Sequence, residues 1–74
     1  MRAKIIKVED GLGYSANDEK YIRPHLNNTV NLTPIAGKFG FFVTDCPVDG
    51  KINNDYVHDG FLVVSVGNLG AIEK

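Results

Sequence analysis

Residues 61–72 read Phe-Leu-Val-Val-Ser-Val-Gly-Asn-Leu-Gly-Ala-Ile, and this stretch decides the fold class. Residues 61–66 are almost entirely apolar and rich in valine, which predicts a strongly apolar β-strand. Asn68-Leu69-Gly70 predicts a tight connection to a last short strand at residues 71–73. An open sheet with so apolar an edge would invite strand addition from other copies. The stretch therefore favours a closed or nearly closed β-structure.

Three stretches upstream have the β-branched content or the alternation of strands: residues 2–8, 29–33 and 39–44. In the last of these, Phe39, Phe41 and Val43 share one face, which makes it the expected central strand. With residues 61–66 and 71–73, the sequence predicts five short strands. The expected core consists of their inward apolar residues and one residue of the last turn: Ile5, Val30, Leu32, Phe39, Phe41, Val43, Val64, Val66, Leu69 and Ile72.

One short helix is expected at residues 16–22. Ser15 is a suitable cap for its first turn, and Pro24 ends it, because a proline disfavours helical geometry in the residue before it. So short a helix does not persist alone in water. It is therefore expected to pack against the sheet through Tyr21 and Ile22.

The segment at residues 45–60 has no strand periodicity and is long for a plain loop in a compact domain. Part of it is expected to form a turn of helix at residues 54–58, closed by Gly60. The side chains expected to reach the core are Ile52, Tyr56 or Val57. Residues 45–60 and residues 10–25 together are longer than is needed to connect the strands. We therefore expect these two segments to carry the function.

The composition limits which classes of protein this chain can belong to. The chain has 74 residues, eight Lys and Arg against nine Asp and Glu, one cysteine and two histidines. It is expected to form one domain, residues 1–74, with a thin core. A single cysteine makes no internal disulfide, and three such side chains are too few for a four-ligand zinc site. No apolar run reaches the length of a membrane span. We expect a cytoplasmic protein with no cofactor and no membrane partner.

The end of the chain resembles the ending of Src-homology-three-like barrels. In those domains an apolar strand, a helical turn carrying a leucine and a final strand with an isoleucine close the barrel; the matching residues here are Val64, Val66, Leu69 and Ile72. Residues 26–32 are similar to the segment in which a small turn leads into a strand. The resemblance implies a mostly β fold with one short helix, as a small five-stranded barrel. It implies no particular function.

The preferred functional hypothesis is a non-enzymatic module that recognises a protein partner through residues 45–60 and the adjoining aromatic strand. Four aspartates and one lysine in residues 39–60 make that region acidic, which suits a basic partner. The candidate residues are Phe42, Asp45, Asp49, Asp55, Tyr56 and Asp59. Chains of this size and style are frequent among phage and mobile-element proteins, so an accessory or host-factor inhibitor role is expected by association.

Phe42 falls on the strand face opposite Phe39 and Phe41, and two interpretations of it stay open. A covering helix or loop would make it core, whereas exposure together with Leu62 would mark a protein interface or a homodimer seam.

Nucleic-acid binding is the alternative function, since small barrels bind nucleic acids with strand faces and loops. Its candidate residues are the basic residues of the N-terminal half: Arg2, Lys4, Lys7, Lys20, Arg23 and Lys38. Four acidic residues interleave with them, which equally suits an ordinary solvated surface. A small-ligand pocket under the long loop is a third possibility.

No motif of an enzyme is present. Cys46 with His25 or His58 would need contact that no motif predicts, so a partly buried thiol is the simpler interpretation. The aspartates of residues 45–59 do not follow the spacing of a calcium-binding loop, because Lys51 and Asn54 occupy the third and sixth positions of a loop that starts at Asp49. We therefore expect neither catalysis nor a metal site.

Overall fold

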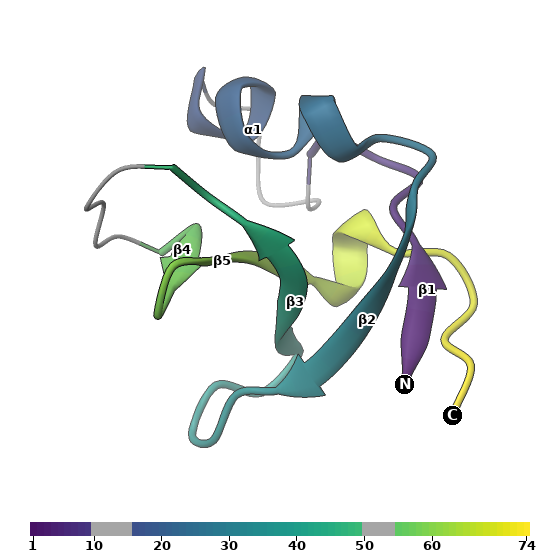
Figure 1. Cartoon of the computed structure of the whole chain (residues 1–74). Coiled ribbons are helices and arrows are strands. Elements are labelled where there is room, and N and C mark those ends of the chain that lie inside the picture. The colour runs from purple at the N-terminus through teal and green to yellow at the C-terminus, as the bar shows by residue number, and fades with distance from the viewer. Residues whose placement is uncertain (10–15, 50–54) are drawn as a thin grey trace.

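The computed structural model describes residues 1–9, 16–49 and 55–74, which form an antiparallel sheet with one short helix (Figure 1). The strand order is β1-β2-β3-β5-β4. The strands are β1 (Arg2–Lys4), β2 (Thr29–Pro34), β3 (Phe41–Pro47), β4 (Val57–His58) and β5 (Phe61–Ser65). The helical elements are α1 (Ala16–Tyr21) and two single 3-10 turns, η1 (Arg23–His25) and η2 (Val66–Asn68). The protein is therefore mostly β, as the sequence predicts.

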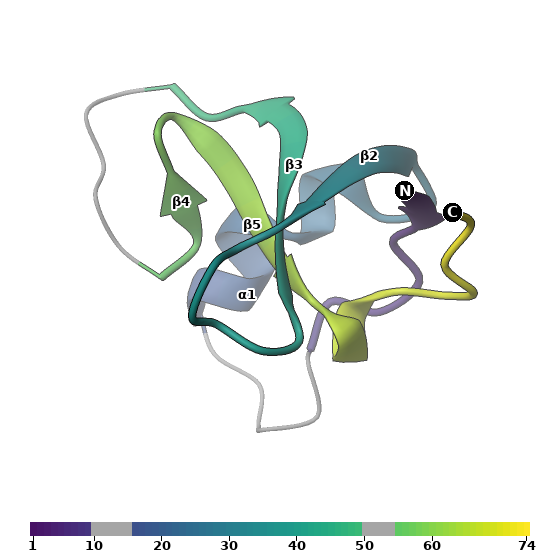
Figure 2. The same cartoon turned by 90° about the horizontal axis from the view of Figure 1, so that it is seen from below.

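The sheet is open, with β1 and β4 as its outer strands, so its ladder does not close into the expected barrel. Residues 71–73 do not form the predicted last strand. Instead, Glu73 makes an isolated bridge to Arg2, with two backbone hydrogen bonds of 2.8 Å. A second bridge joins Ile5 to Leu69. The C-terminal residues thus lie along β1 and cover its free edge, and the two chain ends are close together (Figures 1 and 2).

The predicted helix is confirmed as α1, which lies across one face of the sheet (Figure 2). It ends at Tyr21, and Pro24 lies in η1, where the missing proline N–H is tolerated. Tyr21 and Ile22 are buried, as expected from the need of so short a helix to pack. The expected cap, Ser15, lies outside the described residues.

The core lies between the sheet and the helix. It consists of Ala3, Ile5, Tyr21, Ile22, Val30, Leu32, Val57, Leu62, Val64 and Leu69. Five of the ten expected core residues are among these. Three others, Phe39, Val66 and Ile72, are exposed instead. Phe41 and Val43 are only half-buried.

The inner face of β3 is the opposite of the predicted one. Phe42 packs against the core and Thr44 is buried, whereas Phe41 lies on the other face. Gly40, with a φ of +83°, belongs to a turn, so the strand begins at Phe41 and Phe39 does not take part in its alternation. The register then places Phe42 opposite the core residue Val64. Of the two interpretations of Phe42, the structure supports the core one.

Thr44 is a polar residue in the core, and its hydroxyl is fully used. The hydroxyl donates to the carbonyl of Leu62 at 2.9 Å and accepts from the backbone N–H of Cys46 at 3.1 Å. The register between β3 and β5 shifts between Val43 and Pro47. The threonine therefore supplies hydrogen bonds where the regular ladder is interrupted.

The hairpin of β4 and β5 replaces the helical turn expected at residues 54–58. Asp55 and Tyr56 form a turn, and Val57 and His58 pair with Leu62 and Phe61. Asn54 and Ile52 lie outside the described residues. The alternation Tyr56-Val57-His58 has one buried residue between two less buried ones, which is strand periodicity. Pairing with β4 covers the edge of the apolar strand β5.

Asn68 in η2 joins three parts of the chain through its buried side chain. Its Oδ1 accepts from the backbone N–H and the hydroxyl of Ser65 at 3.0 and 3.1 Å. Its Nδ2 donates to the carbonyl oxygens of Lys7 and Val8, both at 3.2 Å. The amide thereby fixes the chain leaving β1 against the end of β5.

We predict that Asn68→Ala lowers the free energy of unfolding by about 2–3 kcal/mol, because it leaves several partly buried backbone groups without partners. Asn28→Ala is the control, since Asn28 is exposed, and its effect is expected within about 0.5 kcal/mol. Urea unfolding followed by circular dichroism measures both. Equal effects of the two substitutions would contradict the role given to Asn68.

Candidate functional site

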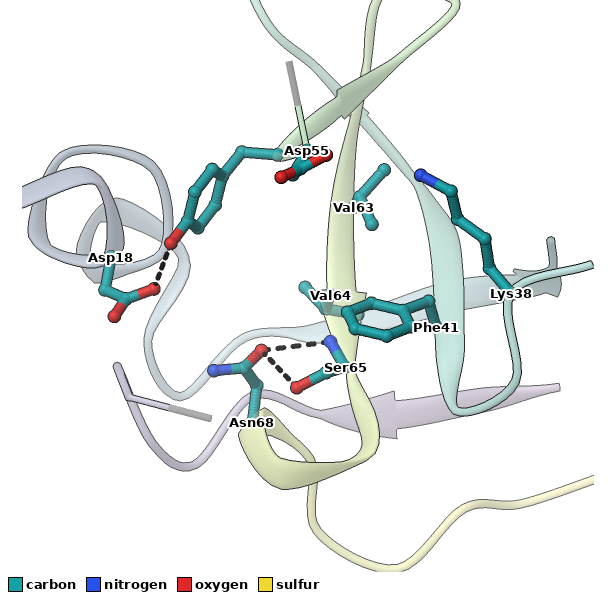
Figure 3. Close-up of a pocket in the computed structure, with 9 residues that line it drawn as sticks. Asp18, Lys38, Phe41, Asp55, Val63, Val64, Ser65 and Asn68 are labelled. Atoms are coloured by element: carbon teal, nitrogen blue, oxygen red, sulfur yellow. Dashed lines mark hydrogen bonds between the residues drawn. The ribbon is translucent and has the colours of Figure 1, made fainter. Parts of the chain in front are cut away.

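A groove of about 450 Å³ opens on the sheet beside α1 (Figure 3). Its lining residues come from six elements or turns: Asp18, Lys38, Phe41, Asp55, Tyr56, Val63, Val64, Ser65 and Asn68. This volume is in the range of sites that take a small molecule or a few side chains.

The floor of the groove is apolar and belongs to the central strands. Phe41 of β3 pairs with Ser65 of β5, and Val63, Val64 and Ser65 line the groove beside it. Val63 is buried although it is not part of the core cluster. The ring of Phe41 lies beside the side chain of Val64 in Figure 3.

One wall of the groove is the side chain of Tyr56, which a buried carboxylate holds in place. The hydroxyl of Tyr56 donates to Oδ1 of Asp18 at 2.6 Å. The rings of Tyr56 and Tyr21 stack with centroids 5.4 Å apart. Asp18 itself is only 3% exposed. This contact attaches α1 to the turn before β4 and keeps the wall in place.

Two exposed charges of opposite sign stand at the rim of the groove. Lys38 reaches over from the turn between β2 and β3, and Asp55 lies on the other side of Val63 (Figure 3). Among the described residues, no ion pair engages either group. The groove thus offers an apolar floor between a cation and an anion.

The turn between β2 and β3 carries the most exposed aromatic side chain of residues 1–9, 16–49 and 55–74. Lys38 donates its N–H to Ile35, and Phe41 donates its N–H to Lys38, which makes two successive four-residue turns. Gly37 and Gly40 occupy the third positions with φ of +79° and +83°, where type II turns favour glycine. Phe39 therefore stands at the tip of the second turn, with a relative exposure of 104%.

A second hollow, the turn hollow, lies next to Phe39 and has a volume of about 490 Å³. Its lining is Pro34, Ile35, Gly37, Lys38, Phe39, Gly40, Phe41, Phe42 and Val66. Val66 is 54% exposed, and its N–H donates to the carbonyl of Gly40 at 2.9 Å, which fixes η2 to the turn. The groove and the turn hollow share Lys38 and Phe41.

The residues proposed from sequence for protein binding are not all in one place. Asp55 and Tyr56 line the groove, and Phe42 lines the turn hollow while packing on the core. Asp49 and Asp59 are exposed residues that flank the hydrogen bond between Val48 and Gly60, outside the groove lining.

Asp45 is exposed, but its carboxylate is engaged within the sheet. It accepts from the side-chain amide of Asn31 at 2.8 Å and from the backbone N–H of Asn31 at 3.2 Å. These hydrogen bonds, chiefly that of the side-chain amide, hold the pKa of Asp45 below its ordinary value of 3.8. The carboxylate thus takes the place of a backbone acceptor where β2 departs from β3.

The basic residues proposed for nucleic-acid binding come from three separate segments (Figure 1). Arg2 pairs with Glu73 at 3.2 Å, and Arg23 makes two contacts with Glu19 at 2.9 and 3.1 Å. The ammonium of Lys20 lies 5.3 Å from the ring centre of Tyr21. The remaining three are exposed: Lys4, Lys7 and Lys38. Of these six residues, only Lys38 lies at the groove.

Cys46 is a free, half-buried thiol that packs against the core. Of the two histidines, His25 is half-buried and His58 is exposed beside Asp59. Within the described residues, no three His, Cys, Asp or Glu side chains are grouped so that they could hold a metal ion. In the same part of the chain, no helix is long and apolar enough to cross a membrane.

Among the contributors to this site that the sequence did not identify are Phe39, Asp18 and Val63. Phe39 was assigned to the core because it alternates with Phe41. The two glycines around Lys38-Phe39 were the available signal, since a glycine on each side of an aromatic residue favours a turn. No local signal links Asp18 to Tyr56, because their contact spans 38 positions.

Neither a protein-family model nor a curated protein nor a solved structure matches this chain.

We predict that Asn31→Ala destabilises the protein near pH 6 but has little effect near pH 2. The lowered pKa of Asp45 means that its ionised form is stabilised by folding, and this contribution is lost as the pH falls through the folded pKa, below 3.8. Urea midpoints of both proteins at the two pH values measure the difference. An Asn31→Ala effect that is the same at both pH values would refute the coupling, and Asn28→Ala serves as the pH-independent control.

Proposed function

We propose that this protein is a non-enzymatic module that recognises a protein through the groove and the turn hollow, together named the recognition face. The observation that carries the proposal is the fully exposed ring of Phe39 at the turn hollow, which adjoins the groove through Lys38 and Phe41. Aromatic side chains of this kind dominate the energetics of protein interfaces. Burying a phenylalanine is worth roughly 1.5–3 kcal/mol, which remains available for a partner here.

The turn that carries Phe39 supports this role, because its backbone is held in place before binding. Two hydrogen-bonded turns and the contact of Val66 with Gly40 fix the position of the tip. A rigid tip loses little conformational freedom on association. Phe39 is part of the turn and not of a strand, so the geometry of the turn keeps its ring exposed.

The sequence predicts that the aspartates of residues 39–60 face a basic partner. Of these aspartates, Asp55 lies at the recognition face. Its carboxylate lies at the groove rim, opposite Lys38, and carries no ion pair among the described residues. We assign Asp55 a role in orienting the partner, since rim charges act on association rate and register more than on affinity. Asp45, bonded to Asn31, is assigned a role in the sheet.

We further propose that the fold belongs to the Src-homology-three-like class, with its barrel closed only by bridges. The support is the path of the C-terminal residues along β1 and the placement of Leu69 in the core after η2. A cytoplasmic location and a role as a phage accessory protein or host-factor inhibitor remain predictions from the sequence.

The recognition proposal predicts that wild-type protein immobilised through its C-terminus captures a partner from the native cell, and that Phe39→Ser loses it. Loss of a hot-spot aromatic weakens binding by roughly 30-fold or more. Phe61→Ser is the matched control, because Phe61 is also an exposed phenylalanine, 40% exposed, but belongs to the β4–β5 end of the sheet. Mass spectrometry identifies the captured protein.

Both variants must first be shown to be folded by their unfolding transitions. A partner retained by Phe39→Ser at wild-type affinity would refute the recognition face. A second pair, Asp55→Lys and Asp49→Lys, makes the same charge change inside and outside the groove. Equal loss of binding in both would show that overall charge, and not the groove, governs association.

The nucleic-acid alternative makes a separate prediction. Arg2 and Arg23 are already paired with glutamates, and the basic residues lie on separate segments, so we expect no retention on heparin or on a labelled oligonucleotide at about 50 mM salt. Phosphate contacts are least screened under those conditions. Retention that falls steeply with added salt would favour nucleic-acid binding instead.

A further inference from the structure

The recognition face presents a projecting ring and an apolar hollow side by side on the same copy. Phe39 stands out from the turn, and the turn hollow beside it is bordered by Pro34, Ile35 and Val66. A surface patch that holds both a knob and a matching hole can associate with itself around a two-fold axis. Each Phe39 would then enter the hollow of the other copy.

The charges on this face are self-complementary. Lys38 is the one charged residue in the whole turn segment, residues 34–42, and Asp55 is the exposed carboxylate across the groove. Each copy therefore offers one cation and one anion, neither of them paired within the described residues. A two-fold contact brings Lys38 of each copy to Asp55 of the other.

The overall charge does not oppose association of two copies. The formal net charge is −1 at pH 7, so two copies repel each other weakly. A partner chosen by bulk charge would need a stronger field than this chain carries. A second copy needs only the local pair of Lys38 and Asp55.

The edges of the sheet offer little backbone for pairing with another copy, so self-association would have to use side chains. The edge of β1 is occupied by the C-terminal residues through the Arg2–Glu73 hydrogen bonds. The other outer strand, β4, has only two residues, Val57 and His58, and so offers a short template for strand addition. The apolar recognition face is a larger contact surface for a second copy than the two-residue edge of β4.

We propose that the recognition face binds a second copy of this chain to form a two-fold symmetric dimer. This inference rests on the proposed function, because it names the partner of the same surface. A standard interface buries roughly 800 Å² per partner, about a sixth of this molecule's 4882 Å² surface. We expect this contact to lie at or below that size, with a dissociation constant in the micromolar range.

Sedimentation velocity of the purified full chain between about 10 µM and about 1 mM tests the dimer, since this range brackets micromolar dissociation. We expect a concentration-dependent shift from one to two copies for the wild type and for the control Phe61→Ser. Phe39→Ser is expected to weaken the dimer by roughly 30-fold. A wild type that stays monomeric, or equal association of Phe39→Ser, overturns the inference.

A charge-swap pair tests the orientation. Lys38→Asp places two carboxylates against each other across the axis, and Asp55→Lys places two ammonium groups there, so each variant alone is expected to associate less. An equimolar mixture restores both opposite-charge contacts and is expected to regain the wild-type association. A mixture no better than either variant, or growth beyond two copies, overturns the two-fold arrangement.

The outcomes separate this inference from the proposed function. A wild type that is monomeric at the highest concentration, yet captures a cellular protein in a Phe39-dependent manner, refutes self-association and supports recognition of another protein. A dimer that captures nothing supports self-recognition. A monomer that captures nothing refutes both.

Discussion

The side-chain amide of Asn68 is the interaction on which the rest of the structure depends. It holds the backbone leaving β1 against the end of β5, and so places Leu69 in the core. With no disulfide and few large core residues, this chain relies on such polar joints to define one arrangement. The position of η2, and through it the turn that carries Phe39, follows from this joint, because Val66 in η2 bonds to Gly40.

Much of the fold could be predicted from the sequence where local chemistry decides it. The alternation in residues 29–33, the valine-rich residues 61–66 and the proline after the short helix all act over a few positions. The inner face of β3 could not be assigned correctly, because the turn at Gly40 removes Phe39 from the strand, and the strand then begins with an apolar residue on each face, Phe41 and Phe42. The pairing of residues 57–58 with β5 depends on contacts along the hairpin, which outweighed the expected helical turn.

The site was less predictable than the fold, because its parts meet only in three dimensions. Asp55 and Tyr56 were proposed from the acidic segment, and they do line the groove. Their partners on the other side, Asp18 and Lys38, come from α1 and from the β2–β3 turn, and no pattern in the sequence joins these segments. Phe39 was equally hard to place. In the sequence it alternates with Phe41 like a core residue, whereas in the structure it lies in a turn.

The pairing of the two chain ends determines how this domain can be joined to another protein. Arg2 and Glu73 exchange backbone hydrogen bonds, so both ends leave the molecule from adjacent points, whereas the turn with Phe39 lies on another side (Figure 1). A domain with adjacent ends can be inserted into a surface loop of a host protein without stretching either one. Such an insertion would leave the groove and Phe39 at a surface away from the two junctions with the host.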